Sequence, residues 1–201
     1  MIYTEKIQKA IKFAIKTHEV YRQQKRKGKG TAYTSHPLTV GLILSLAGAK
    51  EAVIVAGILH DTIEDSVAEK KVTPAMVKER FGKKAKDLVV SVTEMDKDLP
   101  WVQRKALALD HIRHFSHDSV LIKSADVLSN GTELVDDFQK EGGAIFARFS
   151  ASSFDTLANY ERVIAALLKR WPKSPLAGDL KKLAVAIQTL KKSELSRQLK
   201  K

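Results

Sequence analysis

Cysteine is absent from this chain of 201 residues, and so is any long uninterrupted apolar stretch. Without cysteine the protein forms neither disulfides nor thiolate metal sites, which favours a reducing compartment. The longest apolar run, AVIVAGIL, is far shorter than the roughly 20 residues that span a bilayer, and no apolar leader follows Met1. The sequence therefore predicts a soluble, cytoplasmic protein that makes no membrane contact.

Alternating strand patterns and internal repeats are also missing, and apolar residues recur instead at helical spacing. Near the N-terminus, Ile7, Ile11, Ala14 and Ile15 would share one face of a helix. The same spacing returns in three later segments, whose expected apolar faces are Val102, Ala106 and Leu109; Phe154, Leu157, Ile164, Leu167, Leu168 and Trp171; and Leu180, Leu183, Ala184, Ile187 and Leu190. These periods predict an all-α fold.

Local signals indicate where helices begin and end. Thr73 before Pro74 is typical of an N-cap followed by proline in the first turn, and Asp179 would cap a last helix after the break WPKSPLAG. The segment RQQKRKGKGTAY, residues 22–33, predicts a loop because two glycines lie among its cations. We expect a single helical bundle, with residues 1–170 as one domain and residues 171–201 as a C-terminal helix packed on it.

The net charge of +12 is distributed unevenly along the chain. Residues 1–30 carry +7 and residues 169–201 carry +8, which leaves −3 for the middle. Basic ends attract nucleic acids or polyphosphate ligands, although solvated lysine-rich faces are common too. Aromatic residues are few and are not interleaved with the basic runs, which disfavours nucleic-acid binding. A basic helical nucleic-acid-binding protein stays open as an alternative of another class.

The run GILHDTIEDS, residues 57–66, places one histidine and three carboxylates directly after an apolar segment. If one helix continues through this run, His60 and Glu64 lie four residues apart, as do Asp61 and Asp65. Burying such a cluster is costly unless a positive charge lies among the carboxylates. Imidazole and carboxylate are suitable ligands for a divalent metal ion, so the run predicts part of a metal site.

Two further residues could complete that site. His36 stands in YTSHPLTV, just before an apolar segment, and Asp126 stands among apolar residues in VLIKSADVLSN. Each has a simpler interpretation. His36 beside a proline could be a turn or capping residue, and Asp126 could form a buried ion pair with Lys123 or Arg148. Asp61 could likewise be a helix cap.

The order His36, His60-Asp61, Asp126 resembles the H…HD…D pattern of HD-domain phosphohydrolases. More narrowly, the chain resembles the hydrolase domain of the RelA/SpoT family, and among its members the small alarmone hydrolases of the metazoan SpoT homologue type. The stretches that carry the resemblance are THEVYRQQKRKGKGTAYTSHPLTV, AGILHDTIEDS, FGKKAKDLVVSVTEMDK and LIKSADVLSN, which together cover about residues 5–160. The resemblance implies a helical HD-domain bundle.

The resemblance also implies roles for the clustered residues. His36, His60, Asp61 and Asp126 would hold one metal ion, Mn²⁺ in the family, although this shell does not exclude Fe²⁺, Zn²⁺ or Co²⁺. The pair Glu64-Asp65 would accept a proton from the attacking water, as the family's Glu-Asp pair does. Otherwise the pair is a solvated helix end.

Substrate-binding residues follow from the same resemblance. Arg26 and Lys27 match the family's Arg-Lys pair, where a guanidinium can stack on a purine and a lysine can meet phosphate. Further candidates are Tyr33, Lys97, Arg104, Lys105 and Asn130. For most of these, solvated surface is the alternative, and for Tyr33 it is core packing.

The implied activity is manganese-dependent hydrolysis of guanosine 3′,5′-bis(diphosphate), ppGpp, with release of pyrophosphate from the 3′ position. A nucleotidase or an NADPH 2′-phosphatase with the same metal centre is the alternative. The chain departs from the family pattern at Ala32 and Thr34, and again at Gly131 and Thr132, where the family has a hydrophobic residue and arginine. The missing arginine would remove a phosphate or structural contact but leave the metal ligands unchanged.

Overall fold

The computed structural model describes residues 3–94 and 98–198, and within these ranges its regular elements are helices. An isolated antiparallel bridge joins Lys25 and Ala32. The α-helices are α1 (Glu5–Ile15), α2 (Ser35–Leu46), α3 (Glu51–Leu59), α4 (Thr62–Asp65), α5 (Pro74–Phe81), α6 (Lys83–Val92), α7 (Trp101–His111), α8 (His117–Glu141), α9 (Ser153–Arg170) and α10 (Ala177–Gln198). A π-helix, η1 (Lys16–Tyr21), follows α1, and 3₁₀ turns occupy η2 (Ala68–Lys70), η3 (Ile112–His114) and η4 (Gly142–Arg148). The predicted all-α class is confirmed.

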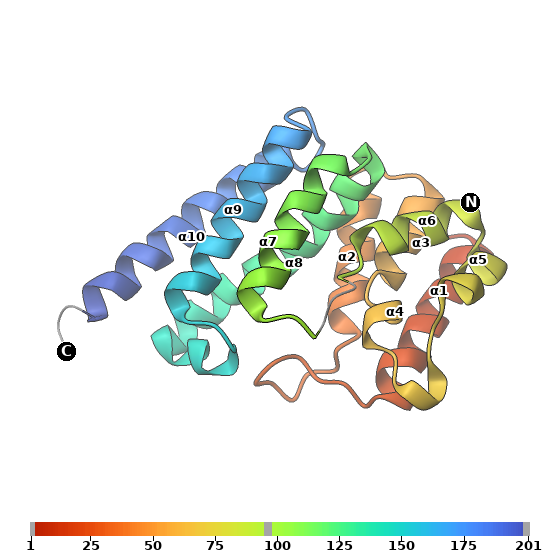
Figure 1. The fold of residues 1–201 in the computed structure, drawn as a ribbon, viewed down its shortest axis with the longest axis horizontal. Helices are drawn as coiled ribbons and strands as arrows, with labels where there is room; N and C mark the ends of the chain where they lie inside the picture. Colours follow the sequence, from red (N-terminus) through yellow and green to blue (C-terminus); the bar gives the residue numbers. More distant parts are fainter. Residues whose placement is uncertain (1–2, 95–97, 199–201) are drawn as a thin grey trace.

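The long helix α8 is the element around which the other helices assemble. It packs against α2, α3 and α6 toward the N-terminal part of the bundle, and against α9 and α10 toward the C-terminal part. Figure 1 shows α10 along the outer edge at one end of the molecule and α1 and α5 at the other. Both groups of helices therefore meet on α8, which brings distant parts of the sequence to its middle turns.

Helices α2 and α3 form a tight antiparallel pair. Gly57 of α3 permits their close approach, because a Cβ atom there would meet Leu44 Cδ1 at 2.2 Å. The two helices run in opposite directions, so the first turn of α2 lies beside the last turn of α3. His36 begins one of these helices and His60 follows the other, which explains how residues 24 positions apart become neighbours.

Several predicted boundaries and faces are confirmed. The Thr73 side chain accepts a hydrogen bond from the Met76 backbone N–H at 3.3 Å, so it caps α5. Residues 22–34 form the expected loop before α2. The apolar face of α10 is buried at Leu180, Leu183, Ile187 and Leu190.

Other expectations are wrong. Ile15, Val102 and Phe154 are exposed rather than buried, and Val102 retains 68% of its accessible surface. Only part of the apolar period of α7 meets the core: Leu109 packs against it, but no residue of this helix is fully buried, because the helix borders a cavity. Asp179 does not cap α10, which begins two residues earlier at Ala177.

The last helix packs closely on the helices that precede it. At Gly131 of α8 a Cβ atom would meet Leu183 Cδ2 of α10 at 2.6 Å. The glycine that departs from the family pattern therefore lies where α10 approaches α8. Across the described ranges, every helix is too short or too polar to cross a membrane. The cytoplasmic location stays a prediction.

Candidate metal centre and active site

The helix expected to run through GILHDTIEDS is interrupted at the HD dipeptide. Helix α3 ends at Leu59 and the short helix α4 begins at Thr62, so His60 and Asp61 form the turn between them. Asp61 occupies the N-cap position of α4, but its side chain makes no capping hydrogen bond. The polar side chains therefore project from a corner rather than from one continuous helix face, and Asp61 is not a helix cap in the chemical sense.

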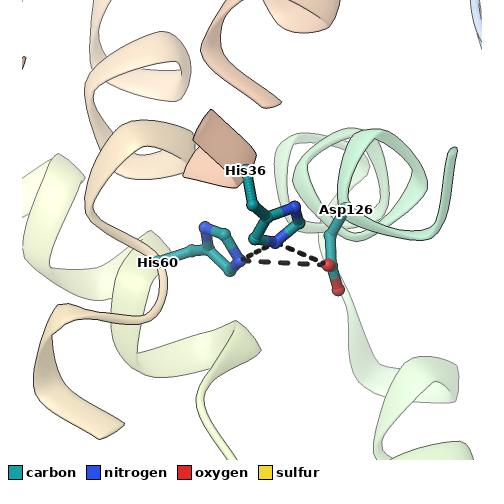
Figure 2. Close-up of side chains that lie close together, drawn as sticks. All are labelled: His36, His60 and Asp126. Carbon is teal, nitrogen blue, oxygen red and sulfur yellow. Dashed lines mark hydrogen bonds and ion pairs between the residues drawn. The ribbon is translucent and has the colours of Figure 1, made fainter. Parts of the chain in front are cut away.

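Helix α2, the turn after α3 and helix α8 bring three of the predicted ligands together (Figure 2). One ligand atom each from His36, His60 and Asp126 lies within 4.8 Å of the others, and all three residues are buried. The Nε2 atoms of the two histidines are 3.3 Å apart. Asp126 Oδ1 lies 3.3 Å from His36 Nε2 and 3.9 Å from His60 Nε2.

Asp61 reaches the same point from the other side. Its Oδ2 atom lies 3.0 Å from His60 Nε2 and 3.7 Å from His36 Nε2. The Tyr33 hydroxyl donates a hydrogen bond to this oxygen. Asp61 therefore lies beside the group of His36, His60 and Asp126, and Tyr33 contributes to holding it rather than only packing in the core.

Hydrogen bonds on the far side of each ring direct the Nε2 atoms inward. His60 Nδ1 is 2.8 Å from the Gly57 carbonyl oxygen, which can only accept, so Nδ1 donates and Nε2 carries the lone pair of the neutral ring. His36 Nδ1 pairs with Ser129 Oγ at 2.9 Å. Asn130 Nδ2 donates to Asp126 Oδ1 at 2.6 Å. Such outer contacts orient metal ligands in proteins.

The charges in the cluster also favour the binding of a cation. Burial opposes charge on His60, but Asp61 and Asp126 outweigh it and raise the pKa of His60 to about 9. Burial acts against the carboxylates too, yet the pKa of Asp126 stays well below its usual value because of Lys123 and the histidines. Lys123 Nζ lies 2.8 Å from Asp126 Oδ2, so the ion pair considered from the sequence does form. Two carboxylates and converging imidazoles thus attract positive charge.

The donor set fits a divalent metal ion. Neighbouring ligand atoms about 2.0–2.2 Å from a metal lie roughly 3–4 Å from one another, as these nitrogen and oxygen atoms do. Two imidazoles with two carboxylates suit Mn²⁺, Fe²⁺, Zn²⁺ or Co²⁺ without selecting among them. Arg148, the other partner suggested for Asp126, instead pairs with Asp137 and Glu141 of α8.

The Glu64-Asp65 pair divides between two environments. Glu64 borders the cavity beside the predicted metal ligands, and its Oε2 lies 3.4 Å from the Glu94 backbone nitrogen. Asp65 faces the N-terminal loop, where its carboxylate contacts Arg22 at 3.1 Å and Gln24 at 3.0 Å. Both side chains are half-buried, so the pair is not a fully solvated helix end.

A cavity of about 620 Å³ opens from the predicted metal ligands and extends between the loop of residues 22–33, α7, α8, η4 and α9. Its cationic lining consists of Arg26, Lys27, Lys29, Arg104, Lys105, Lys123 and Arg148. Most of these cations are paired with carboxylates that line the same cavity. A polyanionic ligand would therefore have to replace these carboxylates as the partners of the cations.

Arg26 is held firmly in the cavity wall instead of in a solvated loop. Its side chain retains 12% of its accessible surface, and its Nε donates to Glu133 at 3.0 Å while Nη2 donates to Asn130 at 2.7 Å. The guanidinium lies 5.7 Å from the centre of the Tyr33 ring. Lys29 pairs with Glu133 and Asp137. These contacts fix the plane of Arg26.

The remaining predicted substrate contacts are dispersed over the cavity. Lys27 is exposed, with Nζ 5.5 Å from the centre of the Phe149 ring. Arg104 lies 3.8 Å from Glu94, and Lys105 pairs with the same carboxylate at 2.6 Å. Lys97 lies outside the described residues.

Sequence reasoning missed several residues that shape the site. Ser129 orients His36, and Glu133 and Asp137 hold the basic loop. Helical spacing could have found Glu133 and Asp137, which follow Asp126 by seven and eleven residues and so share its face of α8. Gln24, by contrast, lies in an irregular loop where spacing gives no signal.

Comparison with known proteins agrees with this geometry. A family model described as HD domain matches residues 10–157. The guanosine-3′,5′-bis(diphosphate) 3′-pyrophosphohydrolase MESH1 of Xenopus tropicalis is 39% identical over 131 residues, covering 64% of this chain and 69% of the relative. Its Homo sapiens counterpart is 40% identical over 128 residues, covering 62% and 67%.

Solved structures give the same result. A metazoan orthologue of SpoT, described as hydrolysing ppGpp, matches with a TM-score of 0.70 and 28% identity, over 90% of this chain and 94% of the other. A protein from Listeria monocytogenes matches with a TM-score of 0.69 and 30% identity, over 78% and 99%. The HD-domain match over residues 10–157 includes all four predicted ligands.

Proposed function

From the premise that this chain belongs to the HD domain family, we propose that it hydrolyses ppGpp to GDP and pyrophosphate with a bound divalent metal ion. The observation that carries the proposal is the group of His36, His60 and Asp126, with Asp61 beside His60, at one end of a cation-lined cavity. The pyrophosphohydrolase activity of the relatives supports the choice of substrate.

The four converging residues would hold the metal ion, and we propose Mn²⁺ by analogy with the family. When bound, such an ion supplies Lewis-acid chemistry, because it makes water more acidic and offsets negative charge on phosphoryl oxygens. The chain's own contribution is to turn both Nε2 atoms inward, through the contact of His36 with Ser129 and the hydrogen bond from His60 to the Gly57 carbonyl.

Glu64 is our choice for the residue that accepts a proton from the attacking water. It borders the cavity one turn after Asp61, whereas the Asp65 carboxylate is engaged by Arg22 and Gln24. General-base catalysis requires such a group within hydrogen-bond reach, directly or through one water. The sequence suggested the same role for Asp65. In this proposal Asp65 is the neighbour of the general base and binds Arg22 and Gln24.

The cations around the cavity would bind the substrate's phosphates. Arg26 presents a fixed guanidinium plane between Tyr33 and the cavity, which supports stacking on a purine. Arg104 Nε is buried and has no hydrogen-bond partner among the described residues. The same holds for Thr156 Oγ1. Both border the cavity, so ligand oxygens would satisfy them.

The test is an assay of the purified protein with Mn²⁺ and a panel of ppGpp, NADPH and simple nucleotides. Our proposal requires pyrophosphate and GDP from ppGpp. Release of orthophosphate from NADPH or from a nucleoside monophosphate, with ppGpp untouched, would instead favour the alternative HD phosphohydrolase. Nucleic-acid binding that weakens steeply with salt, without any turnover, would favour the third class.

A further inference from the structure

His18 is buried completely, yet neither the metal site nor the substrate contacts use it. It belongs to the π-helix Lys16–Tyr21, a type of helix found frequently at functional sites. Its Nε2 atom has no hydrogen-bond partner among the described residues. Its ring packs against Tyr33, with ring centres 4.9 Å apart. Burying a polar ring with an unpaired nitrogen costs free energy, so we expect a role of His18 other than packing.

The hydrogen bonds of Gln24 link His18 to the acidic pair. Gln24 Nε2 lies 3.0 Å from Asp65 Oδ2, and a carboxylate can only accept, so the amide nitrogen must face Asp65. The amide oxygen then faces His18 Nδ1, 2.9 Å away, so Nδ1 must carry the proton. The chain of donors therefore runs in one direction, from His18 through Gln24 to Asp65.

The same N-terminal segment holds both ends of the α4 turn. Tyr33 binds Asp61 at the beginning of the turn, while Arg22 and Gln24 bind Asp65 at its end. The backbone carbonyl of Gln24 accepts from the Tyr33 N–H at 3.0 Å, which ties the two contacts together. Glu64 lies between the two anchored residues.

We propose that His18 is a positioning residue: through Gln24 it holds Asp65 and thereby fixes the turn that carries Glu64 toward the cavity. Burial lowers the pKa of His18, so the ring stays neutral and keeps Nδ1–H as its donor. The consequence for turnover depends on the hydrolytic function proposed above, whereas the hydrogen-bond chain itself does not.

The test compares His18→Leu, which removes the donor, with His18→Asn, whose amide nitrogen can replace Nδ1. We expect His18→Leu to lower kcat for ppGpp at least about tenfold, with KM and Mn²⁺ content nearly unchanged. His18→Asn should recover most of kcat. Thr17→Val is the matched control, because Thr17 is buried in the same π-helix but bonds only to the Phe13 carbonyl in α1.

Gln24→Met extends the test to the middle of the chain. Both residues act through one path. The kcat of the double variant His18→Leu/Gln24→Met should therefore equal that of the slower single variant. Wild-type kcat in His18→Leu, failure of His18→Asn to recover it, or multiplying losses in the double variant would each overturn the positioning role.

Nitrogen-15 NMR of the histidine rings provides a readout that is independent of activity and of the variants' folding. At neutral pH we expect His18 of the wild-type protein to show a protonated Nδ1 and an unprotonated Nε2. The opposite tautomer would contradict the proposal. If the wild-type protein releases no pyrophosphate but shows this tautomer, the proposed function fails while the hydrogen-bond chain stands.

Discussion

At the scale of single residues, the two histidines and two carboxylates are arranged for a cation rather than for one another. His36 and His60 approach through Nε2 atoms 3.3 Å apart, and in the neutral ring of His60 this nitrogen carries a lone pair turned toward His36. Asp61 and Asp126 repel each other across the same small space. A divalent ion would accept the lone pair and offset the repulsion, and this carries our interpretation of the cluster.

Metal affinity should therefore depend on pH through His60. Its pKa is about 9 in the metal-free protein, above the ordinary value of about 6.5. A proton must leave before the metal binds, so affinity should rise about tenfold per pH unit from pH 6.5 and level off near pH 9. Titration calorimetry with Mn²⁺ across this range measures it. Affinity that is constant over the range would contradict the assignment of His60.

The stability of the metal-free protein should show the opposite trend. A group whose pKa is raised on folding stabilises the folded state fully at pH values below its pKa in the unfolded state. This contribution disappears as pH rises through its pKa in the folded state. Protonated His60 thus stabilises the metal-free protein below about pH 6.5 and stops doing so by about pH 9. Chemical denaturation in EDTA at several pH values tests this loss, with His60→Asn as the control that should lack it.

Glu64→Gln keeps the shape of the side chain but removes its ability to take a proton. We expect kcat on ppGpp to fall by about 10²–10⁴, with metal content unchanged. Asp65→Asn should be milder, because its amide can still accept a hydrogen bond from Gln24 through Oδ1. Equal and severe losses in both variants would instead assign the proton transfer to the pair acting together.

At the scale of helices, the sequence predicted caps and buried faces correctly where a local pattern decides them. It predicted the buried face wrongly where a helix borders a cavity instead of the core. The Thr73 cap and the buried face of α10 follow from spacing alone. Helix α7 has a similar apolar period, but Val102 is exposed because the other side of the helix borders the cavity. The break at His60-Asp61 carries no glycine or proline, so nothing in the local sequence marks it.

Gly131 departs from the family pattern, and the close packing of α10 on α8 at this position explains why a glycine is there. Gly131→Leu should lower the free energy of unfolding by about 1–3 kcal/mol, because the new side chain would overlap Leu183 of α10. Combining it with Leu183→Ala should restore part of the loss, and denaturant titration of the four proteins measures the coupling. Additive effects of the two substitutions would show that α10 does not pack on α8 as described.

At the scale of the whole molecule, the basic character of the chain does not make its cavity a free cationic surface. Arg26, Lys29 and Lys105 are each paired with a carboxylate of the cavity wall. The sequence located these cations, but it could not reveal their partners, because Glu133 lies more than 100 residues from Arg26. The four proposed metal ligands were found for a different reason: their order matches the H…HD…D pattern of the family, and each stands beside an apolar segment whose packing fixes its position.

Metal binding should stabilise the entire fold, since the ligands come from α2, the α3–α4 turn and α8. At a hundredfold excess over Kd, a ligand specific to the folded state contributes about 2.7 kcal/mol, or roughly 5–10 °C in Tm for a chain of this size. Thermal melts with Mn²⁺ and with EDTA measure the shift. Asp126→Ala should abolish it, whereas Asp87→Asn should preserve it, because Asp87 is a half-buried residue of α6 that pairs with Lys83.

The most direct test of the central claim is identification of the phosphorus species that the metal-loaded protein releases from ppGpp. Phosphorus NMR of the reaction separates pyrophosphate from orthophosphate, and Asp61→Ala serves as the metal-site control. We predict pyrophosphate and GDP in equal amounts with the wild-type protein, and neither with Asp61→Ala or in EDTA. Unchanged ppGpp with fully metal-loaded wild-type protein, or turnover that persists in Asp61→Ala, would contradict the account.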